Sequence, residues 1–345
     1  MTSRRKFITA CCSLPLIAFL PKLASAENGV EFSNLRGGFS QRLKTILAAG
    51  ELPYIDIESS CKSDELDIDY IAKNMDRLHI GLMALSADIK NDSVEDGKHF
   101  DSLSERLVAS FPDRFIPVGN GGQPPTLEFL EGQEAAAQAK RIMLFGEDEF
   151  RHYPSPRQVK RHNMGRDVSV PIDGPVGHRA FSMSEQTGLP FQIHYEIEDV
   201  LLDPLENMLQ QYPKAKVIWC HLAQIRYIEG ASRYNSVYVE SLIKRFPYLY
   251  FDTAFGDSNS IYPLSNQRHA RVWNEGGNLK VEWRDLIVEY PKRFLSALDL
   301  GGDRLNKIVE YDQKHRKFLR FLPSETQHQV AYRNAWSLLF GEEFH

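Results

Sequence analysis

Residues 190–221 read PFQIHYEIEDVLLDPLENMLQQYPKAKVIWCH and contain the clearest fold signal in the chain. A short apolar run, 190–194, is followed by an amphipathic stretch, 204–212, and then by a second short apolar run, 216–221. Short apolar runs bounded by turn residues predict buried strands, whereas apolar residues spaced three or four apart predict a helix. The stretch therefore predicts a strand–helix–strand unit with two parallel strands.

The same alternation extends along the chain in both directions. Eight short apolar runs predict strands at 53–58, 80–86, 114–118, 141–146, 190–194, 216–221, 248–252 and 294–299. Helical periodicity between them covers 68–78, 102–111, 126–140, 176–188, 204–212, 236–246 and 281–290. Eight strands alternating with helices predict an α/β fold, a (β/α)₈ TIM-like barrel, with an N-terminal helical extension at 41–49 and a C-terminal helix at 324–340. An open doubly wound sheet is the alternative, but no glycine-rich phosphate loop follows the first run.

Composition excludes several classes of protein. The 345 residues are 42% hydrophobic and 25% charged, which is typical of a globular protein and excludes disorder and a multi-span membrane protein. The 41 basic and 46 acidic residues give a net charge of -5, so we expect no nucleic-acid partner. We expect a small-molecule substrate and no stable membrane anchor, and we leave a homo-oligomer open.

The first 26 residues, MTSRRKFITACCSLPLIAFLPKLASA, predict a signal peptide that is cleaved after Ala26. The stretch around Arg4 and Arg5 resembles the twin-arginine export signal, which implies a periplasmic protein that crosses the membrane folded. We therefore predict a signal peptide at 1–26 and a single barrel domain at 27–345. The mature chain keeps two cysteines, Cys61 and Cys220, which we predict to be buried thiols rather than a disulfide framework.

Several of the predicted strands end in a carboxylate or an imidazole. These residues are Glu58, Glu147, His194, His221 and Asp299. Because the carboxyl ends of barrel strands meet at one face, we expect these side chains to converge on one pocket. Two imidazoles and three carboxylates form a ligand set for a divalent metal, one zinc or manganese ion.

The order and spacing of these pieces resembles the amidohydrolase superfamily, over about residues 53–340. The resemblance lies in the first strand, in "PFQIH", "VIWCH", "YFD" and "RFLSALD", and in the closing "RNAWSLLFG". It implies a metal-dependent barrel enzyme of the amidohydrolase-related branch, which includes decarboxylases and lactonases. The first strand departs from the family pattern Asp-x-His-x-His, because Glu58 and Ser60 replace the two histidines that bind metal there.

Two mononuclear arrangements remain open after this departure. In the first, Glu58, His194 and Asp299 bind the metal and His221 acts as acid or base, since some decarboxylases of the branch use Glu at the first position. In the second, Glu147, His194 and His221 bind the metal and Asp299 acts as base, because Gly146-Glu147 is similar to the Gly-Glu of TatD-like hydrolases. Glu58 pairing with a nearby cation is the structural alternative.

The resemblance implies a hydrolase that activates water to cleave an ester, lactone, amide or phosphoester bond. A metal-dependent decarboxylase and an inactive ligand-binding barrel are the alternatives. Arg151, His152 and Arg226 are candidates for binding an anionic group of the substrate, because a guanidinium offers a planar, two-pronged donor.

Overall fold

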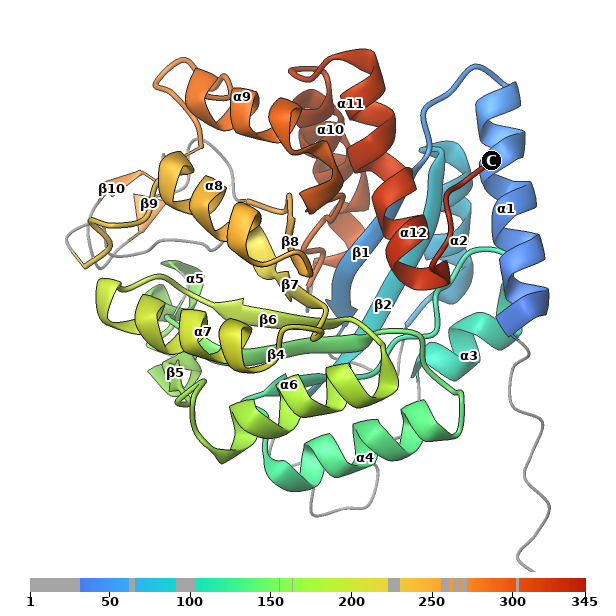
Figure 1. The fold of residues 1–345 in the computed structure, drawn as a ribbon. Coiled ribbons are helices and arrows are strands. Elements are labelled where there is room, and N and C mark those ends of the chain that lie inside the picture. Colours follow the sequence, from blue (N-terminus) through green and yellow to red (C-terminus); the bar gives the residue numbers. More distant parts are fainter. Residues whose placement is uncertain are drawn as a thin grey trace, which may run out of the picture.

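Eight parallel strands form the centre of the computed structural model (Figure 1). Their order is β1 (Tyr54–Cys61), β2 (Ile80–Lys90), β3 (Gly121–Gln123), β4 (Phe145–His152), β6 (Phe191–Tyr195), β7 (Val217–Trp219), β8 (Leu249–Asp252) and β11 (Phe294–Leu295). The structure describes residues 32–61, 66–90, 103–154, 156–162, 164–222, 230–255, 261–262, 267–268, 272–301 and 304–345. Residues 1–31, which include the predicted signal peptide, lie outside this part of the chain.

The two ends of the sheet meet because the chain after β11 hydrogen-bonds with β1. Ile57 N donates to Ser296 O at 3.0 Å, and a parallel bridge joins Ser59 to Leu300. We call this junction, formed by residues 56–60 and 296–300, the seam. Strand order and seam together give the predicted (β/α)₈ barrel.

Buried side chains strengthen the seam. Asp56 is fully buried and accepts hydrogen bonds at Oδ1 from Leu298 N (2.9 Å) and at Oδ2 from the Ser59 hydroxyl (2.6 Å). The Ser59 hydroxyl in turn accepts a hydrogen bond from Leu300 N at 3.2 Å. One carboxylate and one hydroxyl therefore connect the first and last strands.

Helices surround the barrel, as Figure 1 shows. They are α2 (Ile68–Arg77), α3 (Leu103–Ser110), α4 (Leu127–Gln138), α6 (Pro175–Thr187), α7 (Asp199–Gln211), α8 (Ser236–Arg245) and α9 (Val281–Glu289). Aromatic residues at matching positions of β7, β8 and β11 form part of the core: the rings of Trp219 and Phe251 stack with centroids 5.9 Å apart, and those of Phe251 and Phe294 at 6.0 Å. Each such buried aromatic side chain contributes roughly 1.5–3 kcal/mol through the hydrophobic effect.

Helices at both ends of the chain pack on the barrel. The predicted N-terminal helix is longer than expected: α1 spans Phe32–Ala48, and Arg42 donates to Gly81 O and Ile80 O at the start of β2. Helix α10 (Ile308–Leu319) is followed by α11 (Ser324–His328) and α12 (Asn334–Phe340). Asn334, from the closing motif, donates to Pro291 O and Phe294 O and so attaches α12 to the start of β11.

The predicted fourth strand, 141–146, is displaced in the structure. β4 begins at Phe145 and continues to His152, so Glu147 lies within the strand rather than after it. The strand tolerates polar residues because β5 (Val168–Ser169) pairs antiparallel with its end and because Arg166 forms an ion pair with the buried Glu149. The chain between Glu147 and α6 therefore contains the end of β4, α5 (Pro156–Lys160) and β5.

The predicted third strand, 114–118, forms isolated bridges rather than a continuous ladder. Phe115 pairs with Met83, and Val118 pairs with Leu144. Pro117 lies between them and has no N–H to donate, which interrupts the ladder. β3 follows at Gly121–Gln123.

Cys61 and Cys220 are both buried, as predicted. Within the described ranges, no helix has the length and apolar content that crossing a membrane requires.

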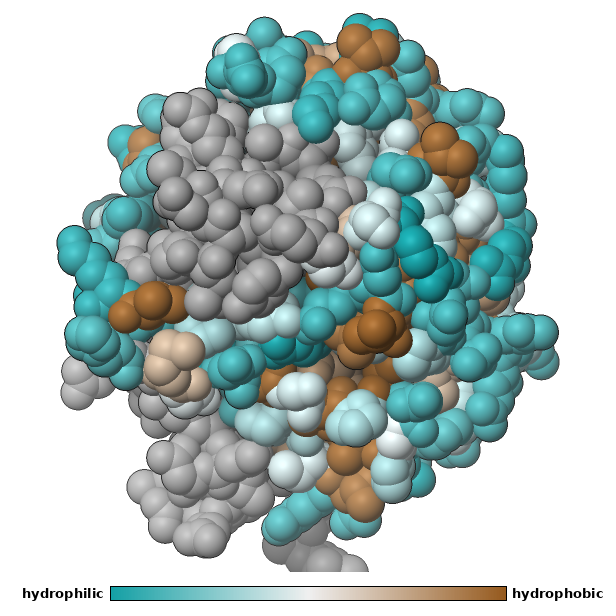
Figure 2. Space-filling model, turned by 90° about the vertical axis from the view of Figure 1, so that its left-hand side faces the viewer, coloured by the Kyte–Doolittle hydropathy of each residue, from teal (hydrophilic) through white to brown (hydrophobic). Residues whose placement is uncertain are grey.

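The segments that follow the carboxyl ends of β4 and β8 lie together on the left of Figure 1. They include β5, β9 (Ile261–Tyr262) and β10 (Gln267–Arg268). Figure 2 therefore views the carboxyl-terminal face of the barrel, where apolar residues alternate with polar ones over most of the coloured surface. Active sites of this fold lie at that face.

Candidate metal centre

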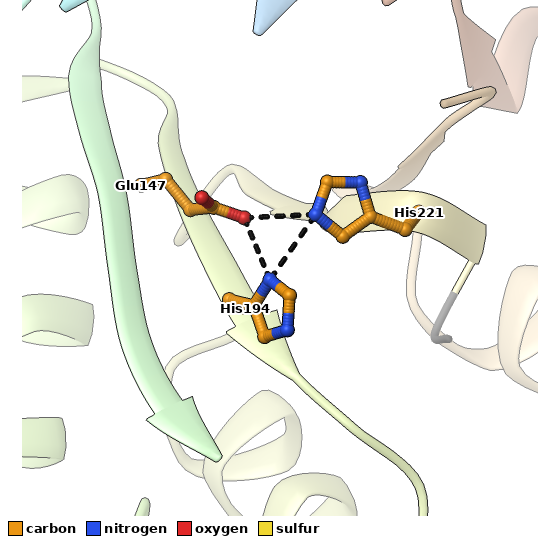
Figure 3. Close-up of side chains that lie close together, drawn as sticks. All are labelled: Glu147, His194 and His221. Carbon is orange, nitrogen blue, oxygen red and sulfur yellow. Dashed lines mark hydrogen bonds and ion pairs between the residues drawn. The ribbon is translucent and has the colours of Figure 1, made fainter. Parts of the chain in front are cut away.

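Glu147 within β4, His194 near the end of β6 and His221 just after β7 converge on one point (Figure 3). Glu147 Oε1 lies 2.9 Å from His194 Nδ1 and 3.1 Å from His221 Nε2. The two imidazole nitrogens are 3.1 Å apart. We call these three residues the triad.

The triad's atoms fit a metal ion better than they fit one another. Protons on both nitrogens can bond to Glu147, but the edge between His194 and His221 would then join two donors. Ligands held at about 2.1 Å from a divalent ion lie roughly 3.0 Å apart in octahedral geometry and roughly 3.4 Å apart in tetrahedral geometry, so the three edges are close to the octahedral spacing. Two imidazoles and a carboxylate suit zinc or manganese.

The electrostatics of the triad favour a cation. Burial alone would lower the pKa of His194, but the charge of Glu147 and its hydrogen bond raise that pKa to about 10. Burial acts to raise the pKa of Glu147, yet the facing imidazoles hold it well below its usual range. The raised pKa of His194 shows that a positive charge is stabilised at this buried point, and the lowered pKa of Glu147 shows that its carboxylate stays ionised there.

The backbone around His221 is shaped for the site. β7 ends at Trp219 rather than at the predicted 221, and His221 takes φ 60° and ψ 30° in the left-handed region. Asp252, at the end of β8, stabilises this conformation by accepting a hydrogen bond from His221 N at 2.8 Å. Such strain in a non-glycine residue is typical of functional sites. It turns the His221 imidazole toward His194 and Glu147.

Glu58 and Asp299 lie beside the triad and group with His221, not with His194 as the first predicted arrangement requires. Glu58 is buried, and its Oε2 has no hydrogen-bond partner among the described residues. Burial and the neighbouring charge of Glu147 raise the pKa of Glu58 well above its usual value. Asp299 has φ 48° and forms an ion pair with Arg304, Oδ1 to Nη2, at 3.0 Å. The structure thus brings together the three side chains of the second predicted ligand set, and Glu58 and Asp299 lie beside them.

The predicted substrate-binding residues have different surroundings. Arg151 is buried and forms ion pairs with Asp167 (2.7 Å) and Glu198 (3.0 Å). These contacts connect the end of β4 with the segment before β5 and with the residues after β6. His152 lies against His194, with ring centroids 4.8 Å apart, so it remains next to the metal position. Arg226 lies outside the described residues.

Sequence reasoning missed two arginines near the site. Arg166 pairs with Glu149 and donates to Gln123 Oε1 at 2.8 Å, and Arg304 pairs with Asp299. Both lie in segments without apolar periodicity, so no local signal in the sequence links them to the strand ends.

A family model described as amidohydrolase matches residues 72–340. The chain belongs to the amidohydrolase family. The comparison with curated proteins finds no match for this amidohydrolase.

Solved structures similar to this amidohydrolase include decarboxylases. A 2,6-dihydroxybenzoate decarboxylase from Rhizobium is 13% identical with a TM-score of 0.54, and the match covers 84% of this chain and 98% of that one. A dihydroxybenzoic acid decarboxylase from a Polaromonas species, solved with manganese and the inhibitor 2-nitroresorcinol, is 12% identical with a TM-score of 0.51, and the match covers 84% and 97%. At these identities the likeness shows the shared barrel fold.

Proposed function

We propose that this amidohydrolase is a metal-dependent hydrolase that cleaves an ester, lactone, amide or phosphoester bond of a small molecule. The triad carries the proposal: three metal-ligand atoms lie 2.9–3.1 Å apart where the strands of the barrel end. A zinc or manganese ion bound there would lower the pKa of water and polarise a carbonyl or phosphoryl oxygen.

Two carboxylates beside the triad supply the acid–base chemistry in this proposal. The Asp299 side chain is 35% exposed and Arg304 binds its Oδ1, so Oδ2 is left to accept a proton from the attacking water. Glu58 is buried, with its pKa raised, and would hold a proton at Oε2 for the leaving group. One half-buried and one buried carboxylate thus take opposite roles.

A decarboxylase is the second candidate. Two observations favour it: the solved structures with TM-scores above 0.5 described above are named as dihydroxybenzoate decarboxylases, and Glu58 replaces a histidine of the usual first-strand motif. In this alternative the site would bind a carboxylated aromatic substrate, and no water would attack.

The first experiment is elemental analysis of the mature protein, purified without chelator. We expect about one equivalent of zinc or manganese in the wild type, retained in Glu58→Ala and lost in His194→Ala. Glu206→Gln, which changes a half-buried carboxylate on α7 that pairs with Arg245, is the control and should keep its metal. A wild-type protein that binds no metal even after incubation with zinc or manganese would contradict both enzyme proposals. The inactive ligand-binding barrel would then be the supported alternative.

The second experiment separates the two enzyme classes. The metal-loaded protein is tested against a panel of esters, lactones, amides and phosphoesters, and against hydroxylated benzoates. Formation of hydrolysis products without carbon dioxide supports the hydrolase, whereas carbon dioxide release from a benzoate supports the decarboxylase.

We also propose that the chain is exported to the periplasm by the twin-arginine route, on the sequence of residues 1–26. The mature protein should then begin at Glu27, which N-terminal sequencing of the periplasmic fraction measures. Export that persists after Arg4→Lys and Arg5→Lys together would contradict this route.

A further inference from the structure

Glu196 lies on the opposite side of the His194 ring from Glu147 and His221. It follows β6 directly and is 1% exposed. Its Oε1 lies 3.0 Å from His194 Nε2, whereas His194 Nδ1 faces Glu147 and His221. The two nitrogens of one imidazole therefore contact two different sets of residues.

The backbone of β4 holds Glu196 in place. Glu196 N donates to Arg151 O at 3.0 Å, and Glu196 Oε1 accepts a hydrogen bond from Tyr153 N at 3.1 Å. Tyr153 is itself held, because its hydroxyl bonds to Glu198 and the Arg151 guanidinium lies 3.4 Å from its ring centroid. Both main-chain contacts leave the Glu196 side chain directed at His194.

These contacts determine which proton stays on the His194 ring when a metal takes the place of the proton on Nδ1. A carboxylate oxygen accepts hydrogen bonds, so the short contact with Glu196 requires a proton on His194 Nε2. The neutral imidazole then has its lone pair on Nδ1, which faces the triad and is the form that binds a metal. Carboxylates that contact the second nitrogen of a metal-binding histidine orient the ring and raise its basicity.

His152 does not supply this contact. Its Nδ1 lies 2.8 Å from Arg166 O, a pure acceptor, so the His152 proton is on Nδ1 and is directed away from His194. His152, His194 and Glu196 can also be read as a second group of metal ligands. That reading would need His194 to bind ions through both nitrogens, and the experiment below tests it.

We propose that Glu196 is a positioning residue, which holds His194 in the Nε2-protonated tautomer with the Nδ1 lone pair directed at the metal position. The inference rests on the proposed metal site and adds to it a residue that binds neither metal nor substrate.

The test compares zinc affinity in the full mature protein, by competition with a chromophoric chelator, for wild type, Glu196→Leu, Glu196→Gln and the control Glu206→Gln. We expect Glu196→Leu to weaken zinc binding by about 10- to 100-fold. Glu196→Gln, whose amide oxygen can still accept from Nε2–H, should lose less, and Glu206→Gln should bind as wild type does. The absorption spectrum of the cobalt-loaded protein should change in Glu196→Leu, because the ring of a ligand has turned.

Each outcome separates the inference from the proposed function. A wild type that binds neither zinc nor manganese overturns the proposed function, and the inference with it. A wild type that binds zinc, with both Glu196 variants equal to Glu206→Gln, overturns the inference alone. If Glu196→Leu does not fold by circular dichroism, Glu196→Gln decides on the same criterion. Two equivalents of zinc in the wild type and one in Glu196→Gln would make Glu196 a ligand and also overturn the positioning role.

Discussion

His221 faces two sets of side chains at once. It completes the triad with Glu147 and His194, and it also groups with Glu58 and Asp299. Its left-handed backbone places it there, supported by the hydrogen bond from its N–H to Asp252. His221 therefore has two roles, one in the backbone conformation and one as a metal ligand. Substitutions that change only one of these roles can separate them.

We expect His221→Asn to fold nearly as stably as wild type while losing most of its metal affinity. Asparagine tolerates the left-handed region, whereas a β-branched residue there costs about 1–2 kcal/mol. His221→Val should therefore lose both metal and stability. Urea unfolding in the presence of chelator measures stability, and elemental analysis measures metal. An asparagine variant that retains a full complement of metal would remove His221 from the ligands.

His315 lies far along the chain from the triad and gives a clear pH dependence. Burial, with help from Arg316, lowers the pKa of His315 from 6.5 to about 3, and its Nε2 lies 2.9 Å from the Ser296 hydroxyl. The unfolded chain gains a proton at this residue below pH 6.5, but the folded chain does not until about pH 3. The stability contributed by neutral His315 is therefore complete above pH 6.5 and is lost as the pH falls toward 3.

Between pH 7 and pH 5 this residue should reduce the free energy of unfolding by about 2 kcal/mol. The measurement is urea unfolding of wild type and His315→Gln at both pH values, in chelator. The glutamine variant should show a decrease smaller by that amount. Equal decreases in the two proteins would show that His315 does not titrate on unfolding.

At the scale of elements, the seam depends on one buried carboxylate. Asp56 accepts hydrogen bonds from Leu298 N and from the Ser59 hydroxyl, and through them connects β1 with the chain after β11. Burial raises the pKa of Asp56 to about 8, although its three hydrogen bonds act to lower it. Asp56 has no role in the proposed mechanism, unlike Glu58 and Asp299 of the same seam, so its structural contribution can be tested separately.

Asp56→Ala should destabilise the protein by about 2–4 kcal/mol, because it leaves a buried N–H and a hydroxyl without their acceptor. Asp56→Asn, which keeps one acceptor oxygen, should cost less. Urea unfolding of the metal-free proteins measures both. A loss below about 0.5 kcal/mol in the alanine variant would show that the backbone bonds of the seam suffice.

Element boundaries show where sequence reasoning succeeds and where it fails. Residues 190–194 and 248–252 predict β6 and β8 within a residue, because apolar side chains and turn residues coincide there. The sequence prediction places β4 too early, because the second half of the strand is polar. That half is stabilised by β5 and Arg166, which are distant in sequence. β7 ends early because His221 leaves the extended conformation, which no composition signal predicts.

At the scale of the whole molecule, the repeated alternation of strand and helix signals makes the barrel predictable from the sequence. Eight strand signals alternating with helices specify a (β/α)₈ order even when one strand, 114–118, forms only bridges. The same order placed Glu147, His194 and His221 at one face, so their convergence followed from topology. Their partners Arg166, Arg304 and Glu196 depend on loop conformation, which the repeat does not specify.

Metal binding should stabilise the whole domain, because the triad joins three strands. A metal at 100 times its dissociation constant adds about 2.7 kcal/mol to the free energy of unfolding. We expect zinc or manganese to raise the thermal midpoint of wild type and of Glu58→Ala, and to leave His194→Ala unchanged. Differential scanning calorimetry with and without chelator measures this. A similar rise in His194→Ala would place the bound metal elsewhere.

The seam also sets the order of events during folding. Asp56 and Leu298 are 242 positions apart, so the ring of strands can close only after most of the chain has left the ribosome. Contacts between such distant residues form slowly, and until then β1 and β11 present unpaired edges to other chains. For a protein that crosses a membrane already folded, as we propose, this delay is spent in the cytoplasm. Closure of the ring, rather than the exposure of a leader, would then mark the moment at which the molecule is ready to leave the cell interior.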